Sequence, residues 1–410
     1  MASELQKKIF ALRQSFLRPR EPALSQLTSL DQLISKLIST LKEGGQKRAL
    51  LILPTRVLES TFFQRLKEKT IVANLQLTIF PADMAHPTVS HVEQVLHHYF
   101  SFTAEAIIAI GGTSVINLAK AVKARVINQD KNIYKLEGLT SRKRHETGPA
   151  LILIPADLAG SEANFSAYIS DYTEHKKFLL IDQSLLANSI LYCQELILTA
   201  TDKRLAGSLC SALITALEAH LSLAANKKAK ADAEAAILQI DRNLSKDSFF
   251  LAGQASGSEE KYQAIKKLLM ASFLAGKSSR LALAGYATAL NHALEIQYGL
   301  SSEEVSPTSL LAILGVYRNE LLLEKELGPD QKQAGIEALQ VRNGLLKKLE
   351  EMVNRLMDRG GFDRKISCLE AKDIPVIVQM VEEEVADLYS VSYKLNTDQL
   401  TAMLGQLVCS

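Results

Sequence analysis

The chain has 410 residues, of which 47% are apolar and 22% are charged, and its formal net charge is +2. This length suits two domains, and the composition is typical of a globular protein. The near-neutral charge gives no electrostatic reason to expect nucleic acid or an anionic membrane as a partner.

The N-terminal segment 1–20 is polar and amphipathic, and it lacks the apolar core and small-residue cleavage site of a signal peptide. No run reaches the roughly 18 apolar residues that a membrane helix needs. The four cysteines are widely spaced and form no CxxC pair, which argues against a zinc knuckle or a disulfide framework. We therefore expect a cytoplasmic protein whose cysteines are free thiols.

In the first half of the chain, short apolar runs alternate with segments of helical period such as 89–100. The runs are 49–53, 75–80, 106–110 and 151–154, and each of them ends at a proline or a glycine. Apolar runs of this kind are typical of buried parallel strands. The alternation predicts a doubly wound, mostly parallel sheet, which is a Rossmann-like α/β fold. Segments 167–169 and 177–181 flank the polar turn 171–175, which predicts a β-hairpin.

The pattern becomes helical after about residue 198. Thr201 or Asp202 is expected to cap a first long helix, and Asn396 or Thr397 a last one. Apolar residues recur at helical spacing on one face of another segment, namely Leu345, Leu346, Leu349, Met352, Val353 and Leu356. We therefore expect an α/β domain over residues 1–200 and an all-α domain over residues 201–410.

The most informative segment is the strand 106–110 with the turn that follows it. Gly111, Gly112, Thr113 and Ser114 lead directly into a helix. Glycines allow a ligand to approach the backbone, and a helix N-terminus attracts phosphate. The alternative is that the two glycines only turn the chain, because the motif is neither a Walker loop nor GxGxxG. The basic run 142–145 is expected to be a solvated loop.

Several motifs occur in the order and spacing of the iron-containing alcohol dehydrogenase family. GGTSVINLAK (111–120) resembles its GGGSxxDxAK, IPADLAGSE (154–162) resembles IPTTAGTGSE shortened by one residue, and ASFLAG (271–276) resembles ASxxAG. The resemblance runs from about residue 50 to the C-terminus. It implies the dehydroquinate synthase-like fold, an NAD(P)-linked alcohol or aldehyde oxidoreductase, and a homodimer as an open alternative.

The resemblance also implies where a dinucleotide, NADP or NAD, lies between the two domains. The implied cofactor-binding residues are Thr55, Gly111, Gly112, Thr113, Ser114, Asn117, Ala156 and Asp157. Thr55, followed by Arg56, stands where an Asp often bonds the adenine ribose, and this change favours NADP over NAD. The alternative for Thr55 and Arg56 is a plain turn at a strand end. Asp157 replaces a threonine of the family and brings a carboxylate that repels phosphate unless it is paired.

The family holds iron or zinc through an Asp and a His four residues apart and two further histidines. The matching segments here are SALITALE (211–218) for DAxxHAxE and GYATALNH (285–292) for GxxHAxxH. The family's fourth ligand lies in a PHG motif fourteen residues after the third. The four ligand positions therefore fall at Ser211, Thr215, Thr288 and Ser302. Neutral hydroxyls are poor ligands for a divalent transition metal, so the resemblance implies that the metal site is lost and that no metal binds.

His292 matches the second histidine of GxxHAxxH, which in the family faces the nicotinamide side of the cleft. One interpretation makes it a catalytic acid toward a carbonyl oxygen. The alternative is a buried histidine bonded to the backbone. Two hypotheses follow for the whole chain. It is a metal-independent or low-activity reductase acting on an unknown small molecule, or it is a catalytically silent pseudoenzyme that keeps the fold for binding or assembly.

Overall fold

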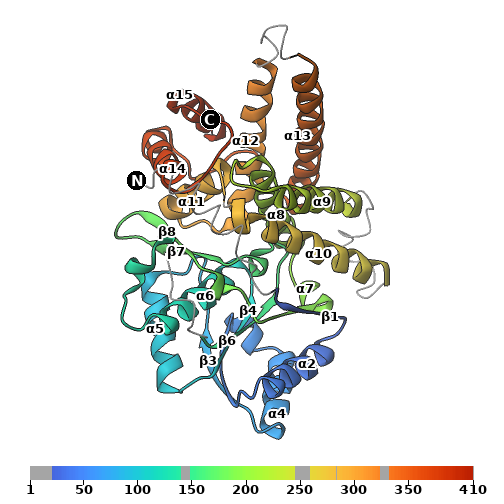
Figure 1. The fold of residues 1–410 in the computed structure, drawn as a ribbon, viewed down its shortest axis with the longest axis vertical. Helices are drawn as coiled ribbons and strands as arrows, with labels where there is room; N and C mark the ends of the chain where they lie inside the picture. The colour runs from blue at the N-terminus through green and yellow to red at the C-terminus, as the bar shows by residue number, and fades with distance from the viewer. Residues whose placement is uncertain (1–20, 140–147, 245–258, 283, 324–331, 410) are drawn as a thin grey trace.

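The computed structural model describes residues 21–139, 148–244, 259–282, 284–323 and 332–409 (Figure 1). The N-terminal segment 1–20 and the basic run 142–145, for which the sequence made predictions, lie outside the described residues. In Figure 1 the sheet and its helices form the lower half of the molecule, and the C-terminal helices form the upper half.

The described residues of the N-terminal part form a six-stranded sheet in which every pairing is parallel. The strand order is β1-β9-β6-β4-β2-β3. The bounds are β1 Ala23–Leu27, β2 Arg48–Leu53, β3 Gln76–Pro81, β4 Ala106–Gly111, β6 Ala150–Pro155 and β9 Ser189–Cys193. The predicted parallel α/β sheet is confirmed, and the four predicted runs form β2, β3, β4 and β6. The sequence did not predict β1 and β9.

Both faces of this sheet are covered by helices, because alternate residues of each central strand point to opposite sides. Leu50, Ile52 and Ile107 belong to one apolar cluster together with residues of α5 (Val89–Ser101) and α6 (Thr113–Ile127). Leu51 and Ile108 belong to a second cluster with α2 (Leu30–Glu43) and α4 (Thr61–Val72). A sheet buried on both faces requires the uninterrupted apolar runs seen in the sequence.

A second, three-stranded sheet carries the predicted hairpin toward the helical part. β7 (Ser166–Asp171) and β8 (Lys176–Ile181) pair antiparallel, and β5 (Gly138–Leu139) is added beside β8. The Asp171 carboxylate accepts a hydrogen bond from Thr173 N at 2.9 Å and so stabilises the turn. The hairpin prediction is confirmed, and its register places Lys177 opposite Ser170.

The C-terminal part is helical. It contains α8 Asp202–Leu221, α9 Lys227–Leu244, α10 Glu259–Ala282, α11 Tyr286–Tyr298, α12 Ser302–Leu323, α13 Lys332–Gly360, α14 Ile374–Leu388 and α15 Thr397–Leu407. Thr201 caps α8, and Asn396 forms a capping box with Gln399 at α15, as the sequence predicted. The predicted apolar face of α13 is buried from Leu346 onward.

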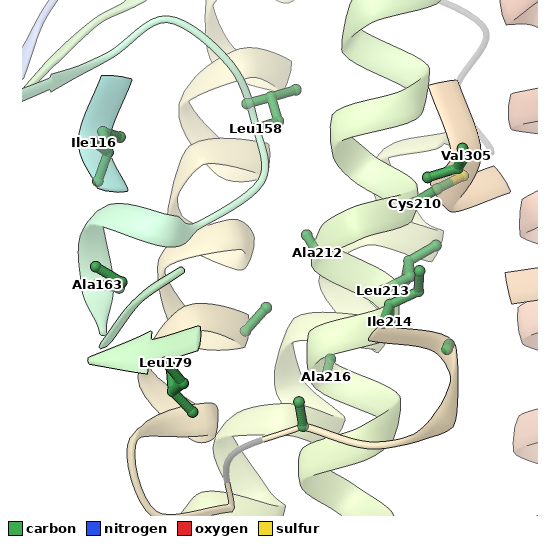
Figure 2. Close-up of a cluster of buried hydrophobic side chains, with 14 of the residues drawn as sticks. Ile116, Leu158, Ala163, Leu179, Cys210, Ala212, Leu213, Ile214, Ala216 and Val305 are labelled. Atoms are coloured by element: carbon green, nitrogen blue, oxygen red, sulfur yellow. The ribbon is translucent and has the colours of Figure 1, made fainter. Parts of the chain in front are cut away.

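One apolar cluster runs without a break from the sheet into the helices. Figure 2 shows Ile116 of α6 and Leu179 of β8 on one side and Leu213 of α8 on the other. Two glycines make the closest approach. A Cβ on Gly160 would lie 2.1 Å from Ser272 O, and one on Gly276 would lie 1.9 Å from Gly160 O. The backbones of the 160 loop and α10 therefore touch, and this contact fixes one part against the other.

Among the helices described, none is long and apolar enough to span a lipid bilayer.

Candidate functional site

A cavity of about 120 Å³ lies between the hairpin, the helix α6 and the C-terminal helices. Its lining includes the four positions that the sequence assigned to lost metal ligands, Ser211, Thr215, Thr288 and Ser302. We call these residues the hydroxyl quartet. Thr113, Asn117 and His292 line the same cavity. The structure thus brings together residues from α6, α8, α11 and α12 that the motifs placed far apart in the chain.

Each member of the hydroxyl quartet donates or shares a hydrogen bond with another protein group. Ser211 Oγ lies 2.8 Å from Ser306 Oγ, and Thr215 Oγ1 donates to Ser211 O at 3.0 Å. Thr288 Oγ1 donates to Glu218 Oε2 at 2.6 Å. Ser302 Oγ donates to Glu295 Oε1. The hydroxyls are therefore integrated into the protein's own hydrogen bonds.

Glu218 connects two of the helices that surround the cavity. Its Oε1 accepts a hydrogen bond from Thr288 N at 3.0 Å, so this carboxyl of α8 caps the N-terminus of α11. Burial raises the pKa of Glu218 to about 7, and the hydrogen bonds from Thr288 oppose that shift. A side chain of α8 thereby holds the first turn of α11 in place.

A buried lysine of the hairpin reaches the same cavity. Lys177 Nζ forms an ion pair with Glu295 of α11, whose side chain is 0% exposed. Burial lowers the pKa of Lys177 to about 7. Lys177 Nζ also lies 3.4 Å from His86 Nδ1, and burial lowers the pKa of His86 to about 3, so that imidazole is neutral. A lysine with a lowered pKa therefore lies one carboxylate away from Ser302, at the edge of the quartet.

His292 is oriented by a carboxylate of α14. Its Nδ1 lies 2.7 Å from Glu384 Oε1, and Tyr389 OH donates to the same carboxylate. The Tyr168 ring packs against the imidazole, with 4.3 Å between ring centroids. Burial lowers the pKa of His292, while the Glu384 carboxylate raises it. A neutral imidazole that donates from Nδ1 to Glu384 presents the lone pair of Nε2, which accepts a proton rather than donating one.

The glycine turn after β4 forms the expected strand–turn–helix, but its helix N-terminus is occupied. Thr113 N donates to Asp157 Oδ2 at 3.0 Å, and Ala159 N donates to Asp157 Oδ1 at 3.1 Å. Asp157 is only 1% exposed. Burial raises its pKa, and the Arg204 guanidinium opposes that shift. The carboxylate that the sequence identified as unfavourable to phosphate thus accepts the hydrogen bond from Thr113 N, the helix N–H group that a phosphate would use.

The other predicted cofactor residues lie around this turn. Ala156 N donates to Gly111 O at 2.9 Å, and Ser114 Oγ donates to Ala85 O. Thr55 begins α3 (Thr55–Leu58) directly after β2, and Thr55 N donates to Asp83 Oδ1 at 2.9 Å. The sequence identified no acid at the end of β2, whereas the structure supplies Asp83 from the neighbouring strand end. Because the Asp83 carboxylate lies at this position, Thr55 does not favour NADP over NAD.

The residues present do not fit the family's metal or its dinucleotide in this arrangement. The positions that match the family's ligands offer four neutral hydroxyls that already bond to protein groups, and such donors are poor ligands for iron or zinc. Over the described residues, no group of three or more His, Cys, Asp or Glu side chains is arranged to hold a metal ion. At the glycine turn, a phosphate would meet the Asp157 carboxylate.

Sequence reasoning missed three charged residues of the site, Lys177, Glu295 and Glu384. Lys177 stands within the predicted hairpin strand 177–181, where a cation beside an apolar run is an unexpected residue for a buried strand. Glu295 lies three residues after His292, on the same face of α11 as Thr288 and His292. Glu384 offers no such signal, because it lies in an acidic run of α14 and meets His292 only in the folded chain.

Comparison with known proteins finds one family in the N-terminal part of the chain. Residues 27–192 match the family model of iron-containing alcohol dehydrogenase. Alcohol dehydrogenase 4 of Schizosaccharomyces pombe is 24% identical over 260 residues, which cover 63% of this chain and 59% of that protein. The chain spans about three fifths of the length of the curated relatives it matches.

Two solved structures cover nearly the whole chain. The crystal structure of 1,3-propanediol oxidoreductase superposes with a TM-score of 0.78 at 20% identity, and the match covers 96% of this chain and 100% of the other. A sulfoacetaldehyde reductase from Bifidobacterium kashiwanohense in complex with NAD+ superposes with a TM-score of 0.73 at 17% identity, with 96% and 98% coverage. At these identities the likeness establishes the fold, including the helical C-terminal part that the family model does not reach.

Proposed function

We propose that the chain is a divergent member of the iron-containing alcohol dehydrogenase family, that it has given up metal-dependent alcohol oxidation, and that it keeps the cavity to bind a small polar molecule. The observation that carries this proposal is the hydrogen bonding of the hydroxyl quartet. Ser302 and Thr288 donate to Glu295 and Glu218, so the former ligand positions now serve the protein's own structure.

The cavity wall has the chemistry of a site for a polar ligand. It combines hydroxyl and amide groups with Lys177, and Asn291 Oδ1 and Ser161 Oγ are buried there without a hydrogen-bond partner in the part of the chain described. Buried polar atoms without partners are costly, and a ligand with hydroxyl groups satisfies them. A volume of about 120 Å³ suits a molecule of a few non-hydrogen atoms or a cluster of waters.

The test combines calorimetry, an activity assay and thermal melting on the purified wild-type chain. We expect no zinc or iron binding at micromolar concentration and no oxidation of NADH or NADPH across a panel of aldehydes, ketones and enones. Small polyols and hydroxy acids are expected to raise the melting temperature, because a ligand that binds only the folded state stabilises it. The Asn291→Leu variant is expected to lose that shift. Turnover that a chelator abolishes would falsify the proposal.

One observation favours a second candidate, a metal-independent reductase. His292 faces the cavity and is held by Glu384 at 2.7 Å, which is the arrangement of a catalytic acid–base group with its positioning carboxylate. Burial lowers the pKa of His292, however, and a neutral imidazole is a poor proton donor to a carbonyl oxygen. Chelator-resistant turnover that His292→Ala abolishes and His292→Gln does not restore is the result that selects this candidate over the first.

A further inference from the structure

Because Gly112 has no side chain, the turn leaves a space beside its backbone, and the Asp157 side chain occupies that space. A Cβ on Gly112 would lie 2.3 Å from Asp157 Oδ2 and 3.0 Å from Arg204 Nη2. Gly112 is the N-cap of α6 and has no side chain to accept from the first helical N–H groups. The carboxylate from the loop after β6 does so instead, by accepting from Thr113 N. It therefore occupies the space and the donor that a glycine turn offers to a ligand.

Asp157 belongs to a charged cluster that joins the two parts of the chain. Arg204 of α8 approaches it from one side, and Arg204 Nε lies 3.8 Å from Glu303 Oε1 of α12. Arg56 of α3 interacts electrostatically with both Arg204 and Glu303. A carboxylate with a guanidinium beside it resembles the charge pattern of a phosphate bound by an arginine. The cluster thus provides an internal anion at the place where the relatives' dinucleotide would bring its own.

We propose that Asp157 is the residue that closes the dinucleotide position of this chain, and that its removal restores binding of a pyrophosphate-containing nucleotide. The inference rests on the proposed loss of redox function. The remaining parts of the position are retained: the glycine turn, the helix N-terminus of α6 and the Arg204 guanidinium. One substitution therefore frees a helix donor and an arginine together and removes a like charge. Repulsion between two anions in contact is expected to weaken binding about tenfold or more.

The experiment titrates NADH, NADPH and ADP into four full-length proteins and measures the dissociation constant by calorimetry and nucleotide fluorescence. These are wild type, Asp157→Thr, Asp157→Asn and the control Asp241→Asn, which removes a carboxylate from the distant Asp241–Lys348 ion pair of α9. Asp157→Asn keeps the shape of the side chain and so guards against a folding defect in Asp157→Thr. Circular dichroism melts establish that each variant is folded.

We expect wild type and Asp241→Asn to bind each nucleotide in the millimolar range or weaker, and both Asp157 variants to bind at least tenfold more tightly. If wild type and the folded Asp157 variants all fail to bind, the inference is overturned and the proposed function stands. If wild type binds NADH or NADPH as tightly as the variants, the inference is overturned, and the turnover assay with chelator then decides the proposed function. Binding of ADP that improves without improvement for the dinucleotides overturns the inference as well, because the closed position is then not the one for the whole cofactor.

Discussion

The two ligand positions of this fold have diverged in different ways. At the glycine turn, the backbone conformation is retained, and the Asp157 carboxylate accepts a hydrogen bond from the N–H group that a phosphate would use. At the metal position, the helical frame is retained, but all four ligand positions carry hydroxyls that now bond to Glu218, Glu295 and neighbouring groups. The first change is local and the second is distributed. A local change is expected to be reversible by one substitution, and a distributed one is not.

Installing the family's four ligands is the change with the largest expected effect, because it reverses the distributed loss that we propose. The variant carries Ser211→Asp, Thr215→His, Thr288→His and Ser302→His. We expect its zinc dissociation constant to fall from about 1 mM or weaker to about 1 µM or below, a gain of roughly 4 kcal/mol. Calorimetry at pH 7.5 measures it.

Partial restoration supplies the control for this gain. Each double variant carries only two of the four ligands, and we expect its zinc dissociation constant to stay within tenfold of wild type, because two protein ligands hold zinc weakly. A single substitution that restores micromolar zinc binding contradicts the view that the loss is distributed.

Disrupting the contact between the loop at Gly160 and α10 has the next largest expected effect. In Gly276→Ala the new Cβ would lie 1.9 Å from Gly160 O, so the 160 loop must move away from α10. We expect a loss of about 3 kcal/mol or more in the free energy of unfolding, measured by urea denaturation. Gly315→Ala is the matched control, since nothing lies within 4 Å of its Cβ and α12 continues through it. The control is expected to gain roughly 0.5–1 kcal/mol. Equal effects in the two variants contradict the close packing.

The sequence predicted the frame of this site better than its chemistry. Apolar runs such as 106–110 identified buried strands because burial on both faces leaves a pattern in consecutive residues, and Thr201 and Asn396 identified helix ends because a cap is a local interaction. The motifs also placed the hydroxyl quartet, and the structure brings its members to one cavity.

The contacts that decide the chemistry are not local and leave no pattern. Lys177 and Glu295 are 118 residues apart, His292 and Glu384 are 92 apart, and Thr113 and Asp157 are 44 apart. The first two pairs form only when α11 packs against the hairpin and α14, and the third forms when β4 and β6 lie side by side, so spacing in the sequence gives no signal. β1 escaped prediction for a different reason, since an edge strand with little buried surface carries no long apolar run.

The pH dependence of stability tests whether burial of the Glu218 carboxyl, which bonds to the quartet, costs free energy. Burial raises its pKa to about 7 from an ordinary value of 4.5. Between these two pH values the unfolded chain releases the proton and the folded chain keeps it, so this group's contribution to stability falls as pH rises. Below pH 4.5 both states are protonated and the contribution is constant. We therefore expect Glu218→Gln, which does not titrate, to gain about 2 kcal/mol relative to wild type between pH 4.5 and 7.

Urea denaturation at half-unit pH intervals measures this difference. Glu162→Gln provides a comparison outside the quartet, since burial raises the pKa of Glu162 to about 7 as well and the same sign is expected. A gap between wild type and Glu218→Gln that does not change with pH contradicts the prediction and leaves the Glu218 cap without an electrostatic cost.

The smallest expected effect concerns His292, the acid–base group that remains at the edge of the metal position. In Glu384→Gln the carboxylate 2.7 Å from His292 Nδ1 becomes a neutral amide, and its attraction for the imidazolium is lost. We expect the pKa of His292 to fall further below its ordinary value, as measured by NMR titration of histidine-labelled protein. Tyr389→Phe keeps the carboxylate and removes only a hydroxyl, so it is expected to shift the pKa less. An unchanged pKa in Glu384→Gln shows that Glu384 does not control the charge of His292. A wild-type pKa above 7 would make His292 a competent proton donor. That result would favour the metal-independent reductase over the binding site.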